Sequence, residues 1–181
     1  MGKLVFQRVT EDVVNQKFDC GVESINEYVR DSYYPTIAQH AYAYTIWGNG
    51  RLLGYVQYLF RDVELEYFPD EIADVDPGVK ENTLSALHIR FLAIDSQYQK
   101  RHIGTSVLEI LIKKIEDMAI DWPIRLITID ARIDLVKWYE RNGFKKIKIN
   151  TPGQDGVTVA MYYDCMKFRQ ELTAFLEAMY E

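Results

Sequence analysis

The sequence predicts an α/β fold with a mixed β-sheet in one domain. Length is the first observation, because 181 residues suit a single domain with a real core. Composition is the second: 48% of the residues are hydrophobic and 13% are aromatic, which excludes a disordered chain. The third is the alternation of strand-like and helix-like patterns, without repeats, low-complexity tracts or linkers. We therefore expect one domain over residues 1–181.

The N-terminal part predicts one strand followed by helices. Residues 3–9 (KLVFQRV) have the composition of a strand, and Thr10-Glu11-Asp12 gives a helix-start signal. A helical pattern then extends to about residue 36 and is interrupted near Cys20-Gly21. Beyond this interruption, apolar side chains recur at helical spacing at Val22, Ile25, Tyr28 and Val29.

A β-hairpin and a central strand follow. In residues 41–60 (AYAYTIWGNGRLLGYVQYLF), two β-rich runs flank Gly48-Asn49-Gly50, which supplies the positive φ that such turns need. We expect the second strand to extend through Val63. Residues 83–95 (TLSALHIRFLAID) form a long, largely apolar run, which predicts a strand in the middle of the sheet.

The C-terminal half alternates helices and strands. A helix is predicted from about residue 104 to 119, with an apolar stripe of Val107, Leu108, Leu111, Ile115 and Met118. The later segments are predicted as strand 124–130, helix 132–142, strand 144–149, turn 153–156, strand 157–163 and helix 164–181. The last helix has an apolar stripe of Met166, Leu172, Phe175, Leu176 and Met179. That stripe must pack on its own sheet or on a second subunit, which leaves a homodimer open.

Charge and cysteine content narrow the class of protein. The formal net charge is −6 and the isoelectric point is near 5.2, which argues against broad nucleic-acid binding while leaving room for a local basic groove. Cys20 and Cys165 are too few for a disulfide framework or a zinc cluster, and no metal site is expected. Because the chain has no apolar run of about 18 residues and no signal-peptide pattern, we expect a soluble, cytoplasmic protein without a membrane partner.

An anion site is indicated by residues 98–108 (YQKRHIGTSVL), where basic side chains precede a glycine and an apolar helix. The start of a helix presents N–H groups without intrahelical partners and the positive end of the dipole, which together favour a phosphate. The sequence has no G-x-G-x-x-G and no G-x-x-x-x-G-K-[ST], so neither a dinucleotide fold nor a P-loop is supported. An ordinary strand-to-helix turn with solvated charges is the alternative.

Residues 130–147 (DARIDLVKWYERNGFKKI) give a second candidate segment. A helix that ends at Asn142-Gly143 before a strand is normal capping. Tyr139 on this helix is either a packed aromatic residue or a phenol that donates a proton to a leaving group.

In this order the two segments resemble the GCN5-related N-acetyltransferases (GNAT), over roughly residues 3–163. The family's Q/R-x-x-G-x-G/A loop corresponds to Gln99-Lys100-Arg101-His102-Ile103-Gly104, and its YxxxGF segment to residues 139–144. The resemblance implies a GNAT-like mixed, mostly antiparallel central sheet flanked by helices, with helix 164–181 as an addition. It also implies that the protein is an enzyme that uses acetyl-CoA as its cosubstrate. In two places the sequence departs from the family pattern: His102 replaces the first glycine, and Arg132 replaces a frequent asparagine.

The resemblance also implies roles for individual residues. Backbone amides of Lys100, Arg101, His102, Ile103, Gly104 and Thr105, following Gln99, would hold the pyrophosphate, and the strand with Leu92 and Ile94 would receive the acetyl thioester. Tyr139 would protonate the departing CoA thiolate.

The general base is left open between His88 and two glutamates. His88 is either a core histidine or the base that accepts the proton of the amine. It shares a strand face with Arg90, and a nearby cation would favour its neutral form. Glu64 or Glu66, acting through water, is the rival.

The acceptor is predicted from an acidic segment and a finer resemblance. Residues 62–81 carry eight acidic side chains and one lysine, which are either solvated surface or the border of a cleft that attracts a cationic amine. Residues 18–29 (FDCGVESINEYV) resemble the opening of a GNAT subgroup that includes toxins acetylating aminoacyl-tRNA, although Phe18, Ile25 and Tyr28 are also explained by packing. Because acidity disfavours RNA binding, we expect a small cationic or protein amine as the acceptor. The alternatives are aminoacyl-tRNA and a non-catalytic acyl-CoA-binding module.

Overall fold

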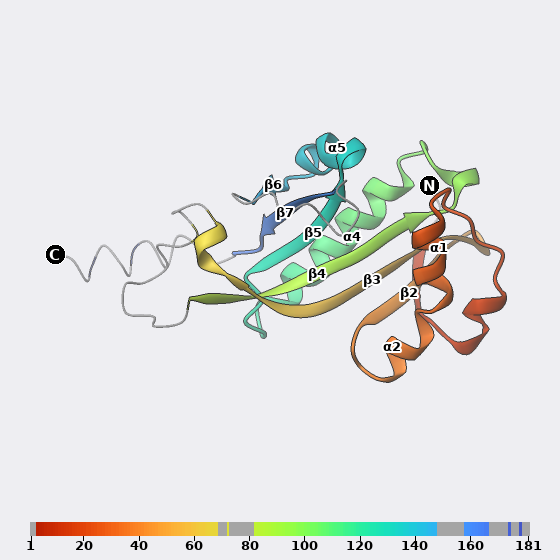
Figure 1. Ribbon diagram of the computed structural model, residues 1–181, viewed down its shortest axis with the longest axis horizontal. Helices are drawn as coiled ribbons and strands as arrows, with labels where there is room; N and C mark the ends of the chain where they lie inside the picture. Colours follow the sequence, from red (N-terminus) through yellow and green to blue (C-terminus); the bar gives the residue numbers. More distant parts are fainter. Residues whose placement is uncertain are drawn as a thin grey trace. The chain divides into compact units, whose positions relative to one another are not determined.

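The computed structural model describes residues 3–68, 72, 82–147, 158–166, 174 and 178. Within these residues the strands form a seven-stranded sheet in the order β1-β2-β3-β4-β5-β7-β6 (Figure 1). The fold is the mixed α/β fold with a mostly antiparallel sheet that the sequence predicts. The chain divides into a first unit, residues 1–60 and 88–111, and a second unit, residues 61–87 and 112–181. The single-domain organisation stays a prediction.

The first unit begins with a strand, three short helical segments and a hairpin. Their bounds are β1 Leu4–Arg8, η1 Glu11–Asn15, α1 Glu23–Arg30, α2 Tyr33–Ile37, β2 Tyr42–Gly48 and β3 Arg51–Glu64, of which β3 continues into the second unit. β1 pairs antiparallel with β2, and β2 with β3, so that Phe6 lies opposite Ile46 and Tyr44 opposite Val56. The predicted strand, helices, interruption and hairpin are all confirmed.

The hairpin turn uses two of its three expected residues. Asn49 has a φ of 50° and Gly50 a φ of 70°, whereas Gly48 still pairs with Arg51 as the last rung of the ladder. A two-residue turn with both φ values positive matches the right-handed twist of the flanking strands. The expectation that Gly48 also contributes a positive φ was wrong.

The core of the first unit lies between its helical segments and one face of its strands. It contains Val13 of η1, Val29 of α1, Ala43 of β2, Tyr55 of β3, and Phe91 and Ala93 of β4. Phe18 packs edge-on against Tyr55, with ring centroids 4.7 Å apart, and Ile25 packs on the same core. Both agree with the packing interpretation of these residues. Tyr28 differs, because 47% of it is exposed.

β4 (Thr83–Ile94) ends the strand part of the first unit, and α4 (Ile103–Met118) begins soon after it. A short 3₁₀ turn, η3 (Ser96–Tyr98), lies between them. Val107, Leu108, Leu111 and Ile115 of α4 are buried and Met118 is half-buried, so the predicted stripe is confirmed. Gly54 of β3 lies against β4 so closely that a Cβ there would approach the Ala93 carbonyl oxygen.

The second unit contains η2 Leu65–Tyr67, β5 Leu126–Arg132, η4 Ile133–Leu135, α5 Val136–Arg141, β6 Lys145–Lys146 and β7 Thr158–Asp164. β7 pairs antiparallel with both β5 and β6. Its core contains Phe68, Ile72, Ala86, Leu126 and Tyr162.

Three boundaries in the second unit differ from those predicted. β5 continues to Arg132 and a 3₁₀ turn follows, so the helix starts at Val136 and not at residue 132. β6 has only two residues in the described chain. β7 still includes Asp164, so the predicted C-terminal helix does not begin at residue 164. The predicted turn 153–156, most of helix 164–181, and Asp70, Glu71, Asp74, Asp76, Lys80 and Glu81 lie outside the described residues.

Candidate functional site

The loop of residues 99–105 connects η3 to α4 in the first unit. Its backbone turns left-handed at Lys100, with a φ of 59°, and at His102, with a φ of 60°. The Ser106 N–H donates to the His102 carbonyl at 3.1 Å, so His102 caps the start of α4. Ile103 and Gly104 come directly before Thr105 and Ser106 at the helix start, where the first N–H groups have no intrahelical partner. The side chains of Lys100, Arg101 and His102 are exposed. This 99–105 loop therefore has the geometry and charge of an anion site.

His102 occupies the position where the family pattern has its first glycine, and it adopts the backbone conformation that glycine takes without strain. The left-handed region costs a residue with a side chain on the order of 1 to 2 kcal/mol. The loop therefore forms with histidine in this place, and the imidazole is exposed.

The Gln99 side chain holds the 99–105 loop in place through two hydrogen bonds to backbone carbonyls. Its Nε2 donates to the Ile94 carbonyl at the end of β4 and to the Cys20 carbonyl, both at 2.9 Å. Both hydrogens of the amide are thereby used. The Gln99 side chain therefore joins the loop to the end of β4 and to the Cys20 turn, and its contribution to cofactor binding stays a prediction.

The turn that supplies the Cys20 carbonyl is built around Asn26, which is buried on α1. Asn26 Oδ1 accepts from the Cys20 N–H at 3.0 Å, and its Nδ2 donates to Asp19 Oδ1 at 2.9 Å. The Gly21 N–H donates to the same carboxylate oxygen at 2.7 Å. The hydrogen bonds from Gly21 and then Asn26 hold the pKa of Asp19 below its ordinary value.

Asp95 joins this turn to the segment after β4. Its Oδ1 accepts from the Gln97 N–H at 3.0 Å, and its Oδ2 accepts from the Asp19 N–H at 3.3 Å. The Ser96 N–H donates back to the Asp19 carbonyl at 2.8 Å. Segments 19–26 and 95–99 are therefore hydrogen-bonded to each other. For residues 18–29 the sequence predicted packing or a likeness to the toxin subgroup and not this hydrogen-bonded turn, although Asp19-Cys20-Gly21 and Asn26 were the available signal.

Tyr139 lies on α5 in the second unit and is buried, with 4% of it exposed. Its ring meets Trp138 and Phe144 edge-on, at centroid distances of 4.6 and 5.4 Å. Burial raises the pKa of the phenol above its ordinary value, so the hydroxyl keeps its proton at neutral pH. A protonated phenol suits the predicted role of proton donor.

The proposed general bases lie in different parts of the chain. His88 is buried on β4 in the first unit, while the guanidinium of its neighbour Arg90 lies 5.0 Å from the ring centroid of Tyr28. Glu64 and Glu66 are exposed in the second unit, and the Tyr67 hydroxyl hydrogen-bonds to both. These bonds raise the pKa of Tyr67 to about 12. The assignment of a base to any of the three residues stays a prediction, as do the roles of Leu92 and Ile94.

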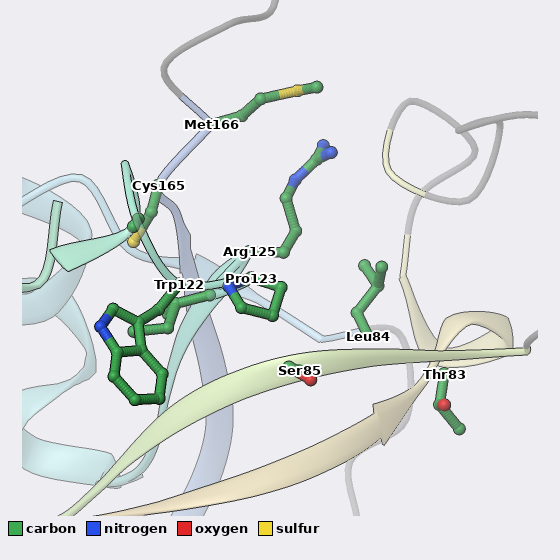
Figure 2. A pocket seen from close by; sticks show the side chains of 10 residues that line it. Thr83, Leu84, Ser85, Trp122, Pro123, Arg125, Cys165 and Met166 are labelled. Carbon is green, nitrogen blue, oxygen red and sulfur yellow. The ribbon is translucent and has the colours of Figure 1, made fainter.

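Each unit contains a cavity. The cavity of the first unit has a volume of about 430 Å³ and is bordered by Tyr98 and Ile103, on either side of the 99–105 loop. The cavity of the second unit has a volume of about 360 Å³ and is lined by Leu84, Trp122, Pro123, Arg125, Cys165 and Met166, none of them a predicted site residue (Figure 2). There Arg125 pairs with Asp164 at 2.9 Å.

Two further properties follow from the described residues. Among them, no group of three or more histidine, cysteine, aspartate or glutamate side chains could hold a metal ion. No helix in this part of the chain is long and apolar enough to cross a membrane.

Solved structures resemble the chain over nearly its whole length. One described as a bacterial toxin is 21% identical, covers 98% of this chain and 97% of its own, and has a TM-score of 0.74. AtaT complexed with acetyl-methionyl-tRNAfMet is 16% identical, with coverages of 99% and 100% and a TM-score of 0.74. AtaTR bound with acetyl-CoA is 17% identical, with coverages of 96% and 98% and a TM-score of 0.72. At these identities the likeness shows the fold.

Sequence comparison gives the family. No curated protein matches the chain in sequence. Residues 70–163, which are just over half of the chain, match the acetyltransferase (GNAT) domain, a family whose cosubstrate is acetyl-CoA. The chain thus belongs to the GNAT acetyltransferases.

Proposed function

We propose that the protein transfers an acetyl group from acetyl-CoA to the amino group of an aminoacyl-tRNA. The observation that carries this acceptor is the full-length likeness to toxin structures, one of which is solved with an acetylated aminoacyl-tRNA. The 18–29 segment supports it, because the sequence of this segment resembles the toxin subgroup and its turn is bonded to the 99–105 loop.

The small cationic acceptor expected from the sequence stays an untested alternative. It depends on acidic residues 62–81 acting together, and most of these lie outside the described residues. Glu64 and Glu66 are described, and both are engaged with the Tyr67 hydroxyl. A small cationic amine is therefore an outcome of the test below and not the leading acceptor. A tRNA acceptor agrees with the cytoplasmic location expected from the sequence.

The residues of the chain fit direct transfer between two bound substrates. The helix start at the 99–105 loop suits the pyrophosphate of acetyl-CoA, which supplies the activated thioester. Tyr139 holds a proton for the departing thiolate, and His88, Glu64 or Glu66 accepts the proton of the amine. Both cysteines are buried, and neither lies in the two family segments, so no thiol is placed for a covalent acyl-enzyme.

The experiment supplies acetyl-CoA with charged tRNAs, and separately with polyamines, aminoglycosides and lysine peptides, and measures CoA release and N-acetylation. We expect turnover with at least one charged tRNA and none with the same tRNA uncharged. Turnover of small amines alone would contradict the proposed acceptor. CoA binding without turnover of any amine would support a non-catalytic acyl-CoA-binding module.

A further inference from the structure

Arg90 of β4 has an exposed side chain that is held by an aromatic ring of α1 in the first unit. Its guanidinium carbon lies 5.0 Å from the ring centroid of Tyr28, over the ring face. The Tyr28 ring in turn stacks on Phe91, at a centroid distance of 6.4 Å, and Phe91 belongs to the buried core. The core therefore fixes the Tyr28 ring, and a cation–π contact between this ring and Arg90 fixes the guanidinium.

The Arg90 guanidinium has no acidic partner in the described part of the chain. None of the carboxylates described there lies within salt-bridge distance of it. The acidic side chains of α1 act on Arg30 instead. Glu23 hydrogen-bonds to Arg30, and Glu27 and Asp31 also raise its pKa.

A guanidinium that stacks on a ring uses its flat face for that contact. Its N–H groups lie in the plane and point outward, so the contact with Tyr28 does not occupy them. Planar N–H groups of this kind form two parallel hydrogen bonds with a carboxylate or a phosphate. Arg90 therefore has the geometry of a preorganised site for one of these two anions.

The position of Arg90 on β4 indicates which anion this is. Arg90 comes two positions after His88, a candidate base, and two before Leu92, on the strand expected to receive the acetyl thioester. In an aminoacyl-tRNA the carboxyl group of the amino acid is esterified to the 3′-terminal ribose, so no carboxylate of the backbone remains. The charged group nearest to this ester is the phosphate of the terminal nucleotide. Small amines and lysine side chains carry no such phosphate.

We propose that Arg90 binds the phosphate of the 3′-terminal nucleotide of the acceptor and so distinguishes an aminoacyl-tRNA from a free amine. The proposal rests on the acceptor proposed above. Tyr28 is a positioning residue, because its ring fixes the plane of the guanidinium without contacting the phosphate. This role also accounts for a tyrosine that is 47% exposed beside an exposed arginine.

The test compares two fragments of the acceptor that differ only in this phosphate. They are the aminoacyl esters of adenosine and of adenosine 5′-monophosphate, and kcat/KM is measured for the N-acetylation of each. The variants are Arg90→Gln, Arg90→Lys, Tyr28→Phe and Tyr28→Ala. A CoA dissociation constant from calorimetry shows that each variant is folded.

Two matched controls lie on the neighbouring helices. Arg30→Gln removes an exposed guanidinium of α1 that pairs with Glu23 at 2.6 Å. Tyr34→Ala removes an exposed tyrosine of α2. We expect wild type and both controls to prefer the phosphorylated fragment by roughly tenfold or more, the value of a hydrogen bond between charged groups.

The preference should be lost in Arg90→Gln and restored in part by Arg90→Lys. Tyr28→Phe should keep it, because the ring remains, and Tyr28→Ala should reduce it. The proposal is overturned if wild type acetylates both fragments equally well, if the preference persists in Arg90→Gln, or if Arg30→Gln loses it as well. Failure of wild type to acetylate any charged tRNA would instead refute the proposed acceptor, and the role of Arg90 with it.

Discussion

The rings of Tyr139 and Phe144 meet edge-on at 5.4 Å because the chain between them closes a helix C-cap. The Phe144 N–H donates to the Tyr139 carbonyl at 3.1 Å, and the Gly143 N–H donates to the Glu140 carbonyl at 3.1 Å. These are the two bonds of a Schellman motif, in which a hydrophobic contact accompanies the left-handed residue. The YxxxGF spacing thus has a local reason, because it fixes the phenol ring against Phe144, the residue before β6.

Gly143→Ala should lower the free energy of unfolding by more than 2 kcal/mol. Gly143 has a φ of 88°, which costs an alanine about 1 to 2 kcal/mol, and its new Cβ would lie 3.1 Å from Tyr163 Cε2. The Tyr163 ring cannot move freely, because its hydroxyl is bonded to Glu116. The control is Gly50→Ala, which has a φ of 70° with nothing within 4 Å. Equal losses in urea unfolding of the two variants would contradict the packing argument.

Tyr139→Phe should reduce kcat by roughly 10²-fold, the low end for acid–base catalysis, with little change in the dissociation constant of CoA. Since burial raises the pKa of Tyr139, its donor form persists above the ordinary tyrosine value of about 10. Below pH 10, the kcat of wild type and the kcat of Tyr139→Phe should therefore change with pH in the same way. A wild-type kcat in the variant would assign Tyr139 to packing alone.

Gln99→Glu should raise the dissociation constant of CoA by about tenfold or more. The new carboxylate would face the carbonyl oxygens of Ile94 and Cys20, which now accept from the amide, and the loss of these two part-buried bonds costs about 1 to 3 kcal/mol. Gln97→Glu is the matched control, because it makes the same charge change two residues earlier on a side chain that, like that of Gln99, is exposed. If both variants bind CoA equally well, Gln99 does not position the loop.

His102→Gly should raise the free energy of unfolding by about 1 kcal/mol, because glycine takes the left-handed conformation at this position without strain. CoA affinity should stay equal or increase. His102→Ala removes the imidazole but keeps the Cβ, so it should not stabilise the protein. Thermal and urea unfolding of the pair measure the difference, and a less stable glycine variant would refute the strain at His102.

Tyr55→Phe should stabilise the protein by about 1 kcal/mol. The Tyr55 side chain is fully buried, and its hydroxyl has no hydrogen-bond partner among the described residues. Burial raises its pKa to about 12. Tyr58→Phe is the control, because the Tyr58 hydroxyl hydrogen-bonds to Tyr44 and its removal should destabilise. A loss of stability in Tyr55→Phe, measured by urea unfolding, would indicate a bound partner for this hydroxyl.

Local patterns were sufficient to predict most elements and the loop. The apolar stripe of α4, the Asn49-Gly50 turn and the Asn142-Gly143 cap each depend on residues a few positions apart, so periodicity and turn chemistry reveal them. The start of α5 was misplaced, because the pairing of β5 with β7 extends β5 to Arg132. Such pairing is a tertiary effect that a local window does not contain.

The hydrogen bonds that hold the loop could not be predicted in the same way. The Asp19 N–H meets Asp95 across 76 positions, and Gln99 meets the Cys20 carbonyl across 79. The sequence around each of these residues does not indicate which distant residue it will bond. The half-exposed Tyr28 was missed for a related reason, since helical spacing assigns it to a buried face while its ring lies beside Arg90 and Phe91 of β4.

The separation between Cys20 and Gln99 also determines when the 99–105 loop acquires its shape during folding. Closing a segment of 79 residues has a length-dependent entropic cost of roughly 4 kcal/mol. The three direct bonds between the two segments contribute only about 1 kcal/mol each. We therefore expect these bonds to form after Phe18 has packed on Tyr55, so that the 99–105 loop acquires its conformation late in folding.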